Sequence, residues 1–175
     1  EFDLSDTQLG LLGGLTFAVF YATLGLPIAR LADQFSRKWI VVASLIVFSV
    51  LTGFSGWASG FIMLLILRMG VGIGEAGVNP ASHSMIADYF PPQRRSFAMS
   101  MLAVGASLGM MAGFAGGGAI AEAYNWRVAL MCVGFPGVIL AIAMAVFFRE
   151  PPRGSFDDDS SLTPFAKPNG IQDRS

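Results

Sequence analysis

Two charged residues, Arg68 and Glu75, interrupt the long apolar stretch 61–87, and their types and spacing suggest chemistry. The sequence around them, RMGVGIGEAG, contains the spacing G-x-G-x-x-G. That spacing binds dinucleotide phosphates when it follows a strand in a soluble βαβ unit. Here the preceding residues are FIMLLILR, inside a run long enough to cross a bilayer. The pattern therefore indicates a membrane helix that carries two charges, and it argues against a nucleotide-binding loop.

A charged side chain at the centre of a membrane costs at least ~2.5–3.5 kcal/mol of insertion free energy. Such residues therefore usually face a cavity or a partner. Arg68 and Glu75 are nearly two helical turns apart, so both project from one face, about 10 Å apart along the axis. Asn79 and His83 continue this face at i+4 steps, with Ser82 close by. We expect a water-accessible path, with Arg68 and Glu75 as coupling residues and the other three as cavity-lining residues. A purely structural Arg–Glu pair with polar interhelical contacts is the alternative.

Other chemistries find little support in the sequence. His83 is the only histidine and Cys132 the only cysteine, which excludes a multi-histidine metal site, an intrachain disulfide and a cysteine-rich zinc site. The stretch GFSG at 53–56 matches the G-x-S-G of intramembrane serine proteases, whose serine needs a histidine base within hydrogen-bond reach. Ser55 and His83 are expected near opposite faces of the bilayer. We therefore expect no catalytic residue, no metal and no cofactor.

The elements that must position these residues follow from composition. The chain has 175 residues, of which 54% are hydrophobic and only 13% charged, against about 25% charged in a typical soluble domain. Apolar stretches of the ~20 residues needed to cross a bilayer lie at about 8–29, 39–59, 61–87, 97–121 and 128–148. Only helices satisfy their own backbone in lipid as single segments. The sequence predicts an all-α integral membrane protein with five transmembrane helices.

Orientation follows from the cations, which gather at alternate connections. They are Arg30, Arg37, Lys38, Arg94, Arg95, Arg149 and Arg153. The other side carries mainly acidic residues and Arg127, so the positive-inside rule places the basic connections in the cytoplasm and residue 1 outside. The net charge of −1 argues against a nucleic-acid partner. Residues 151–175 are rich in Pro, Ser and Asp and are predicted to form a cytoplasmic linker.

Glycines recur at four-residue intervals on two of the predicted helices. Small residues at this spacing let a neighbouring helix approach closely. We predict helix-packing roles for Gly70, Gly74, Gly105, Gly109, Gly113 and Gly117.

Several motifs resemble those of the major facilitator superfamily. The loop motif G-x-L-A-D-R-x-G-R-K is partly matched by Leu31, Ala32, Asp33, Arg37 and Lys38. The helix-four motif R-x-x-x-G-x-G-E-A is matched by Arg68, Gly72, Gly74, Glu75 and Ala76. The helix-five motif G-x-x-x-G-P-x-x-G-G is matched at Gly105, Gly109 and Gly113, whereas Met110 and Phe114 depart from it. GIGEAG-x-N-P-A together with ADYFPPQRR resembles the spinster-like branch most.

This resemblance implies helices two to six of a twelve-helix transporter, within its N-terminal six-helix half. Residues 1–150 would form the membrane domain, and residues 151–175 would lead to a C-terminal half that, like helix one, lies outside this chain. Glu75 would be the protonatable residue, with Arg68 as its partner near an acidic group of helix one. Asp33, Arg37 and Lys38 would help close the cytoplasmic side.

We therefore predict a secondary active transporter that moves a small amphipathic or lipid-like organic solute by alternating access, coupled to protons. Its partners would be that solute, protons and the lipid bilayer, in the plasma membrane of a bacterium. The alternative within the family is an organic-anion symporter in which Arg68 binds a substrate carboxylate. Alternatives of other classes are a membrane enzyme and a purely structural membrane protein.

Overall fold

A computed structural model describes residues 4–156, without the side chains of Ala29, Ala32 and Asp33. The described chain is helical, and one π-helical segment, η1, follows its first short helix. The elements are α1 (Asp6–Gly10), η1 (Leu11–Leu15), α2 (Thr16–Gln34), α3 (Arg37–Ser55), α4 (Phe61–Ala76), α5 (Val78–Tyr89), α6 (Pro92–Ala123) and α7 (Trp126–Phe147). Within this part of the chain, five helical segments are long and apolar enough to span a membrane: Asp6–Ile28, Arg37–Trp57, Phe61–Tyr89, Pro92–Ala123 and Trp126–Phe147.

Local sequence signals explain where these helices begin. Ser5 caps α1 in a capping box with Gln8, Ser36 caps α3, and the side chain of Asn125 accepts the Val128 N–H to cap α7. Each cap satisfies a backbone N–H that has no partner within its helix. The caps at Ser36 and Asn125 also keep the connections before α3 and α7 short.

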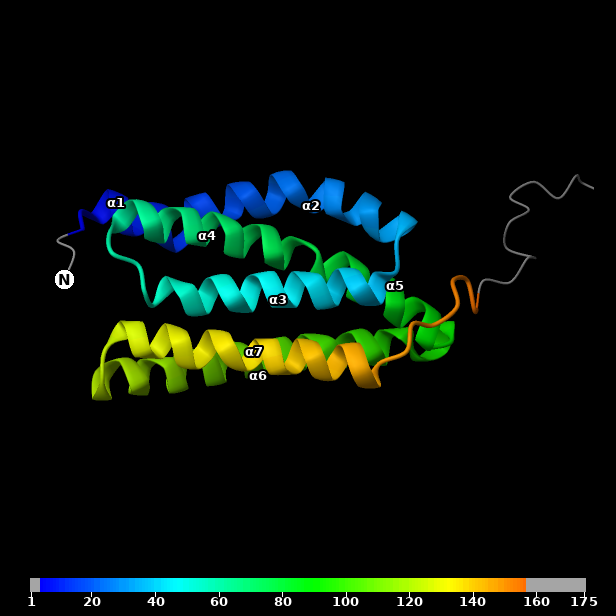
Figure 1. Cartoon of the computed structure of the whole chain (residues 1–175). Coiled ribbons are helices and arrows are strands. Elements are labelled where there is room, and N and C mark those ends of the chain that lie inside the picture. Colours follow the sequence, from blue (N-terminus) through cyan, green and yellow to red (C-terminus); the bar gives the residue numbers. More distant parts are fainter. Residues whose placement is uncertain (1–3, 157–175) are drawn as a thin grey trace, which may run out of the picture.

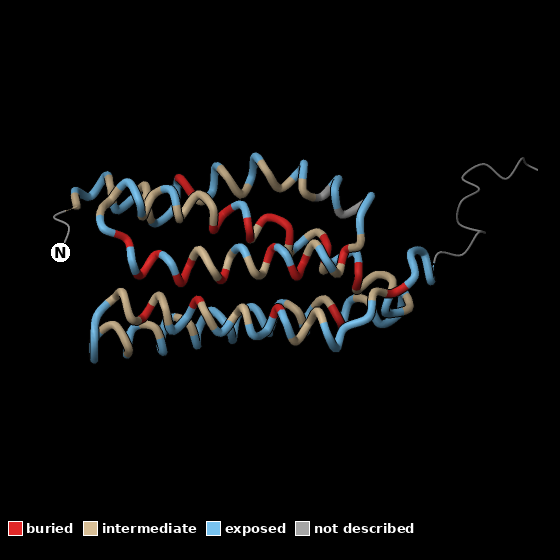
Figure 2. The backbone as a smooth tube through the Cα atoms, in the orientation of Figure 1, coloured by how far each residue is buried: buried red, intermediate tan, exposed pale blue. Residues whose placement is uncertain are grey.

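The helices form a layered bundle with α3 in its middle (Figure 1). α2 and α4 lie on one side of α3, and α6 and α7 lie on the other. Buried residues concentrate along α3 and on the helix surfaces that face it (Figure 2). α3 thus holds the two outer layers together.

The contact between α3 and α7 is close, and small residues make it possible. A Cβ atom added to Gly134 on α7 would lie 2.7 Å from the Cα atom of Gly53 and 2.9 Å from the Ser49 carbonyl oxygen. A Cβ atom added to Gly53 would lie 2.8 Å from the ring of Phe135. The GFSG stretch therefore serves helix packing, and the hydroxyl of Ser55 donates to the Leu51 carbonyl at 2.8 Å.

The glycines predicted to pack helices fall into two groups. A Cβ atom added to Gly74 would lie 2.7 Å from the Phe48 backbone nitrogen, so Gly74 lets α4 approach α3 closely. Gly70, also on α4, faces Leu51 of α3. On α6, Gly117 faces Val133 at 3.6 Å. By contrast, a Cβ atom added at any of the other three α6 positions would meet no described atom within 4 Å. These positions are Gly105, Gly109 and Gly113.

The expectation of one continuous helix over 61–87 needs correction. α4 ends at Ala76, Gly77 forms a turn, and α5 runs from Val78 to Tyr89. Pro80 lies in the first turn of α5 and has no N–H, so it cannot donate to the Ala76 carbonyl as a continuous helix would require. The third span, Phe61–Tyr89, is therefore interrupted at Gly77, between Glu75 and Asn79.

Connections alternate between the two ends of the bundle. The α2–α3 and α5–α6 connections and the segment 148–156 lie at one end, and the α3–α4 and α6–α7 connections lie at the other (Figure 1). The basic connections thus share one end, as the positive-inside pattern requires. Arg127, the cation at the opposite end, donates to the carbonyls of Gly56 and Ala58 just after α3, at 3.2 and 2.6 Å.

Candidate functional site

Arg68 and Glu75 are both partly buried on α4. The Arg68 Nε–H donates to the Leu12 carbonyl of η1 at 3.2 Å, which ties α4 to the first span. Both salt bridges found among residues 4–156 involve Arg37, so none joins Arg68 to Glu75 in this part of the chain. Arg68 is thus held by a backbone oxygen, and the two charged groups are not bonded to each other.

Arg68 lies at the meeting point of two cavities. One, of about 600 Å³, extends between α6 and α7 and is otherwise lined mainly by apolar residues such as Phe48 and Phe114. The other, of about 320 Å³, extends toward Leu12 of η1. The two share Arg68, Thr52, Trp126 and Leu130.

Thr52 is the second polar residue that lines both cavities. Its side-chain oxygen is buried and has no hydrogen-bond partner among the described residues. A buried hydroxyl without a partner is costly, and ordered water or a ligand commonly satisfies such a group. Thr52 and Arg68 together could therefore receive a polar or anionic group in otherwise apolar surroundings.

The rest of the predicted polar stripe lies on the other side of the helix break. Asn79 is exposed, and its Nδ2 donates to the hydroxyl of Tyr21 on α2 at 3.0 Å. Ser82 is partly buried and His83 is exposed, both on α5. Neither cavity at Arg68 is lined by any of these three residues, nor by Glu75. The five predicted residues therefore divide into Arg68 at the cavities, Glu75 at the end of α4, and three residues on α5.

A second polar centre lies around Arg37, at the end of the bundle that carries the basic connections. Arg37 is only 3% exposed, and its guanidinium forms an ion pair with Asp88 of α5 and a second with Glu150, where Nε and Oε1 are 3.4 Å apart. It also donates to the hydroxyl of Ser84 at 2.9 Å and to the Pro151 carbonyl at 3.2 Å. One buried cation thus joins the start of α3, the end of α5 and the segment after α7.

Glu150 is held by three donors from the start of α3. Its carboxylate accepts the Arg37 backbone N–H at 2.8 Å, the Arg37 Nε–H, and the hydroxyl of Ser36. Burial alone would raise the pKa of Glu150, but the hydrogen bonds from Ser36 and Arg37 and the charge of Arg37 lower it below its usual value. Glu150 is therefore ionised at neutral pH.

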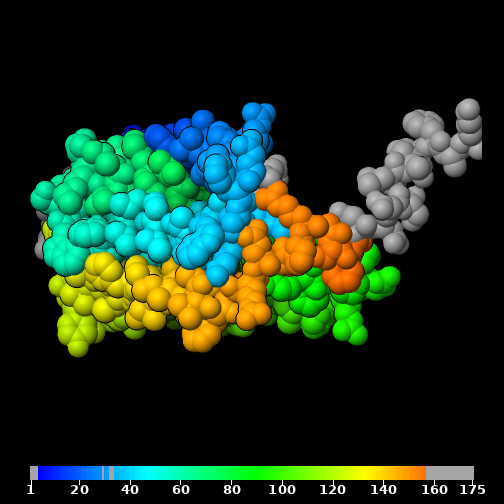
Figure 3. Space-filling model, turned by 45° about the vertical axis from the view of Figure 1, so that its right-hand side comes forward, coloured from blue at the N-terminus to red at the C-terminus, as the bar shows by residue number. Residues whose placement is uncertain are grey.

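The segment after α7 continues over the ends of α2 and α5 (Figure 3). The Arg153 Nη2–H donates to the Phe35 carbonyl at 2.7 Å, and the Gly154 N–H donates to Asp88 Oδ1 at 3.1 Å. Gly154 has a φ of 69°, which glycine adopts without strain. Tyr89 adds a hydrogen bond to the Arg149 carbonyl.

Of the residues predicted to close the cytoplasmic side, Arg37 is therefore in the middle of this cluster. Lys38 instead lies over the ring of Trp39, 5.1 Å from its centroid. Asp33 is in the last turn of α2, and its side chain lies outside the described residues. The sequence analysis did not identify Asp88 or Glu150 as site residues. Both are carboxylates at the end of a span and next to a basic connection, and this pattern could have indicated ion pairs.

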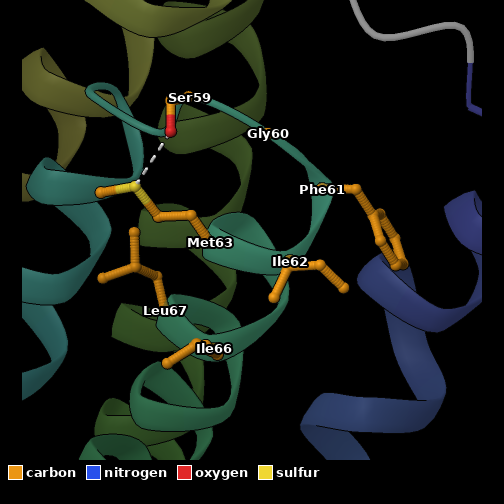
Figure 4. A pocket seen from close by; sticks show the side chains of 7 residues that line it. All are labelled: Ser59, Gly60, Phe61, Ile62, Met63, Ile66 and Leu67. Atoms are coloured by element: carbon orange, nitrogen blue, oxygen red, sulfur yellow. Dashed lines mark hydrogen bonds between the residues drawn. The ribbon is translucent and has the colours of Figure 1, made fainter.

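A third hollow, of about 510 Å³, lies at the N-terminal end of α4, and Figure 4 shows the side chains that line it. Its only hydroxyl belongs to Ser59, which lies 3.8 Å from the Met63 sulfur. The other lining side chains are apolar and include Phe61, Ile62 and Leu67. Because it contains no charged or titratable group, this hollow offers no chemistry beyond contact with apolar molecules.

Comparison with known proteins places this arrangement in a family. Residues 1–169 match the Major Facilitator Superfamily. The structure resembles the crystal structure of a bacterial homolog to the human lysosomal transporter spinster, in an inward-facing and unoccupied conformation. The TM-score is 0.79 at 38% identity, over 90% of this chain and 38% of that one.

Two curated relatives agree with this match. An MFS-type efflux pump of Mycolicibacterium smegmatis is 36% identical over 81% of this chain and 33% of its own length. The cis,cis-muconate transport protein of Acinetobacter baylyi is 32% identical over 86% of this chain and 36% of its own length. The chain thus spans about a third of the length of these relatives. With five membrane-spanning helical segments, no strand among the described residues, and spinster-like structural similarity, the chain belongs to the Major Facilitator Superfamily.

Proposed function

We propose that the full-length protein is a secondary active transporter of the plasma membrane, the inner membrane of a bacterium. It moves a small amphipathic or lipid-like organic solute by alternating access and couples this movement to protons. The observation that carries the proposal is the placement of Arg68, which lies inside a membrane span at the junction of two mainly apolar cavities. Glu75 follows nearly two turns later, partly buried and without a salt bridge to Arg68.

This placement favours function over a purely structural Arg–Glu pair. A structural pair inside a membrane would be bonded directly, because each unpaired charge costs several kcal/mol. Arg68 instead donates to the Leu12 carbonyl and lines both cavities. Charges held apart in this way can bind and release protons or ligands without breaking the packing of the helices.

Glu75 is the proposed proton switch. Burial favours the neutral form of a carboxyl group, and a nearby guanidinium favours its charged form. Opening the transporter to one side or the other changes both influences, so protonation becomes linked to the direction in which the cavity opens. An acidic group on helix one, outside this chain, would be the further partner of Arg68.

The cytoplasmic cluster supports a gating role for Arg37, with Asp33 and Lys38 proposed as further gating residues. Arg37 joins three chain segments at the end where a cytoplasmic gate would close. A gate needs interactions that hold one state without making it permanent. The network is rich in charge-assisted bonds and partly exposed at Glu150, which suits that requirement.

The test is proton-driven flux by full-length Glu75→Gln in liposomes. We expect this variant, which mimics the protonated carboxyl, to lose pH-gradient-driven flux while it still binds substrate and keeps wild-type thermal stability. The matched control is Glu122→Gln at the exposed end of α6, which should transport normally. Normal gradient-driven flux by Glu75→Gln would reject the proton switch, and lost flux with an unstable protein would favour the structural pair.

An organic-anion symporter remains the second candidate. It is favoured by the unpartnered hydroxyl of Thr52 beside Arg68 and by the relative that transports cis,cis-muconate, a dicarboxylate. In that case Arg68→Gln should abolish binding of a dicarboxylate, and Thr52→Val should weaken it by roughly an order of magnitude, as for one lost hydrogen bond to a charged group. Unchanged binding of cis,cis-muconate by both variants would reject this candidate.

A further inference from the structure

The first span, Asp6–Ile28, runs alongside the third, Phe61–Tyr89, through three successive contacts. The first along the chain is the hydrogen bond from Arg68 to the Leu12 carbonyl. Next, Phe17 packs against Gly72, where an added Cβ atom would lie 3.0 Å from the Phe17 carbonyl oxygen. The third is the hydrogen bond from Asn79 to the Tyr21 hydroxyl. These contacts follow the same order along both spans, so α2 lies against the segment that contains Glu75.

Glu75 lies between the second and third of these contacts. It is three residues after Gly72 and four before Asn79. Residues three apart on one helix share a face, so Glu75 projects from the side of α4 on which Gly72 contacts Phe17. The rings of Phe17 and Tyr21 are stacked, with centroids 5.8 Å apart and planes inclined by 20°.

The hydrogen bond between Asn79 and Tyr21 helps to fix the position of α5, because the helix is broken between α4 and α5. α4 ends one residue after Glu75, and Pro80 cannot donate a backbone hydrogen bond across the break to the Ala76 carbonyl. The backbone therefore fixes the angle between α4 and α5 less firmly than it would within a continuous helix. The bond between Tyr21 and Asn79 crosses this point from outside, because Tyr21 is on α2 and Asn79 is on the first turn of α5.

We propose that Tyr21 is a positioning residue for Glu75, which acts by holding Asn79 and so fixing α5 relative to the end of α4. This inference rests on the proposed role of Glu75 as the proton switch. The hydroxyl of Tyr21 sets how far the break can open, and thus how much water reaches the Glu75 carboxyl in each state of the transporter.

Among the described side chains of the packed elements, few titratable or charged groups lie at the level of Glu75. Arg68 on α4 supplies the nearby charge, and Tyr21 is the titratable group of α2 at this level. α3 contributes the neutral Ser44, which adjoins Gly77 at the break. On α5 the next titratable group is His83, which is exposed and one turn beyond Asn79. A changed pH dependence after loss of the Tyr21 hydroxyl would therefore report on Glu75 and its access to water.

The experiment compares Tyr21→Phe with the wild type in the full-length protein by two measurements. The first is proton-driven flux in liposomes as a function of pH. The second is the rate at which a thiol reagent labels a cysteine placed at Ser82 of α5, in an otherwise cysteine-free protein. Tyr124→Phe is the matched control, because Tyr124 is exposed at the far end of α6.

We expect Tyr21→Phe to speed labelling at position 82 by roughly two- to tenfold, the equilibrium effect of one neutral hydrogen bond. The flux–pH profile should shift with it, and Tyr124→Phe should change neither. Both effects should be absent when Tyr21→Phe is added to Asn79→Ala, because the two side chains act as one unit.

Unchanged labelling by Tyr21→Phe would overturn the inference. So would faster labelling with an unchanged pH profile, because Tyr21 would then hold α5 without acting through Glu75. Normal gradient-driven flux by Glu75→Gln would instead reject the proposed function, and the labelling result would still show whether Tyr21 holds α5. The two failures are therefore distinguishable.

Discussion

Replacing Asp88 with Asn tests whether the cluster around Arg37 holds the helix ends together. Asn keeps the size of the side chain, and its carbonyl oxygen can still accept the Gly154 N–H. Unlike Asp, however, Asn has no negative charge to balance the positive charge of Arg37. The side chains of Arg37 and Asp88 are only 4% and 10% exposed, so solvent screens their attraction little.

The size of the effect follows from what Arg37 retains. Removing one partner of a buried ion pair costs about 3–5 kcal/mol when the remaining charge has no other partner. Arg37 keeps Glu150, with Nε and Oε1 3.4 Å apart, and the hydroxyl of Ser84 at 2.9 Å. We therefore expect Asp88→Asn to lower the free energy of unfolding by about 1.5–3 kcal/mol, the contribution of one hydrogen bond to a charged group.

The assay is the free energy of unfolding of the full-length protein, from titration of the detergent-solubilised protein with sodium dodecyl sulfate. Glu122→Gln is the control, because it removes a carboxylate from an exposed position on α6 and should change stability by less than about 0.5 kcal/mol. Wild-type stability of Asp88→Asn would refute the reasoning. An equal loss in Glu122→Gln would also refute it, since the effect would then be one of net charge.

Three further predictions follow from the same structure. Because the folded-state pKa of Glu150 is lowered, its stabilising contribution is present above the unfolded pKa of about 4.3 and is lost as pH falls through the folded value. The stability difference between wild type and Glu150→Gln should therefore persist from pH 5 to 8, on the order of 1 kcal/mol, and vanish in more acidic solution. Gly134→Ala should destabilise the protein by about 1–3 kcal/mol, because its Cβ atom would lie 2.7 Å from an α3 Cα atom, whereas Gly116→Ala, with open space around it, should not. A cysteine at Gln93 should react only with reagent that reaches the cytoplasm and one at Ala123 only with external reagent, and labelling of both from one side would contradict the topology.

The apolar stretches were sufficient to predict the five spans and the all-helical class. A segment that crosses the water-free core of a bilayer needs about 20 apolar residues, and its backbone groups must form their hydrogen bonds within the segment. This requirement can be recognised from the sequence alone. The alternation of basic connections is equally local, and the structure places those connections at one end of the bundle. Motifs such as Arg68 with Glu75 were sufficient to indicate the family, which the comparisons confirm.

The break in the third span could be predicted only in part from the sequence. Gly77 and Pro80 are both helix-weakening residues, but proline is common in membrane helices and often produces only a kink. Pro27 and Pro136 show this directly, because α2 and α7 continue through them. Whether a given proline ends a helix depends on how neighbouring helices satisfy the freed backbone groups, which the local sequence does not state.

Which side chains meet was decided by the tertiary structure. The sequence placed Arg37 in a cytoplasmic connection, but its contacts with Asp88 and Glu150 join positions 51 and 113 residues away along the chain. In the same way, Gly53 was conspicuous for its motif, and only the packing against Gly134 showed that it belongs to a helix contact. Composition and periodicity determine which segments enter the membrane, because the free energy of transfer into lipid is a sum over each segment. Pairing between helices depends on the fit of distant surfaces, and only the folded bundle brings those surfaces together.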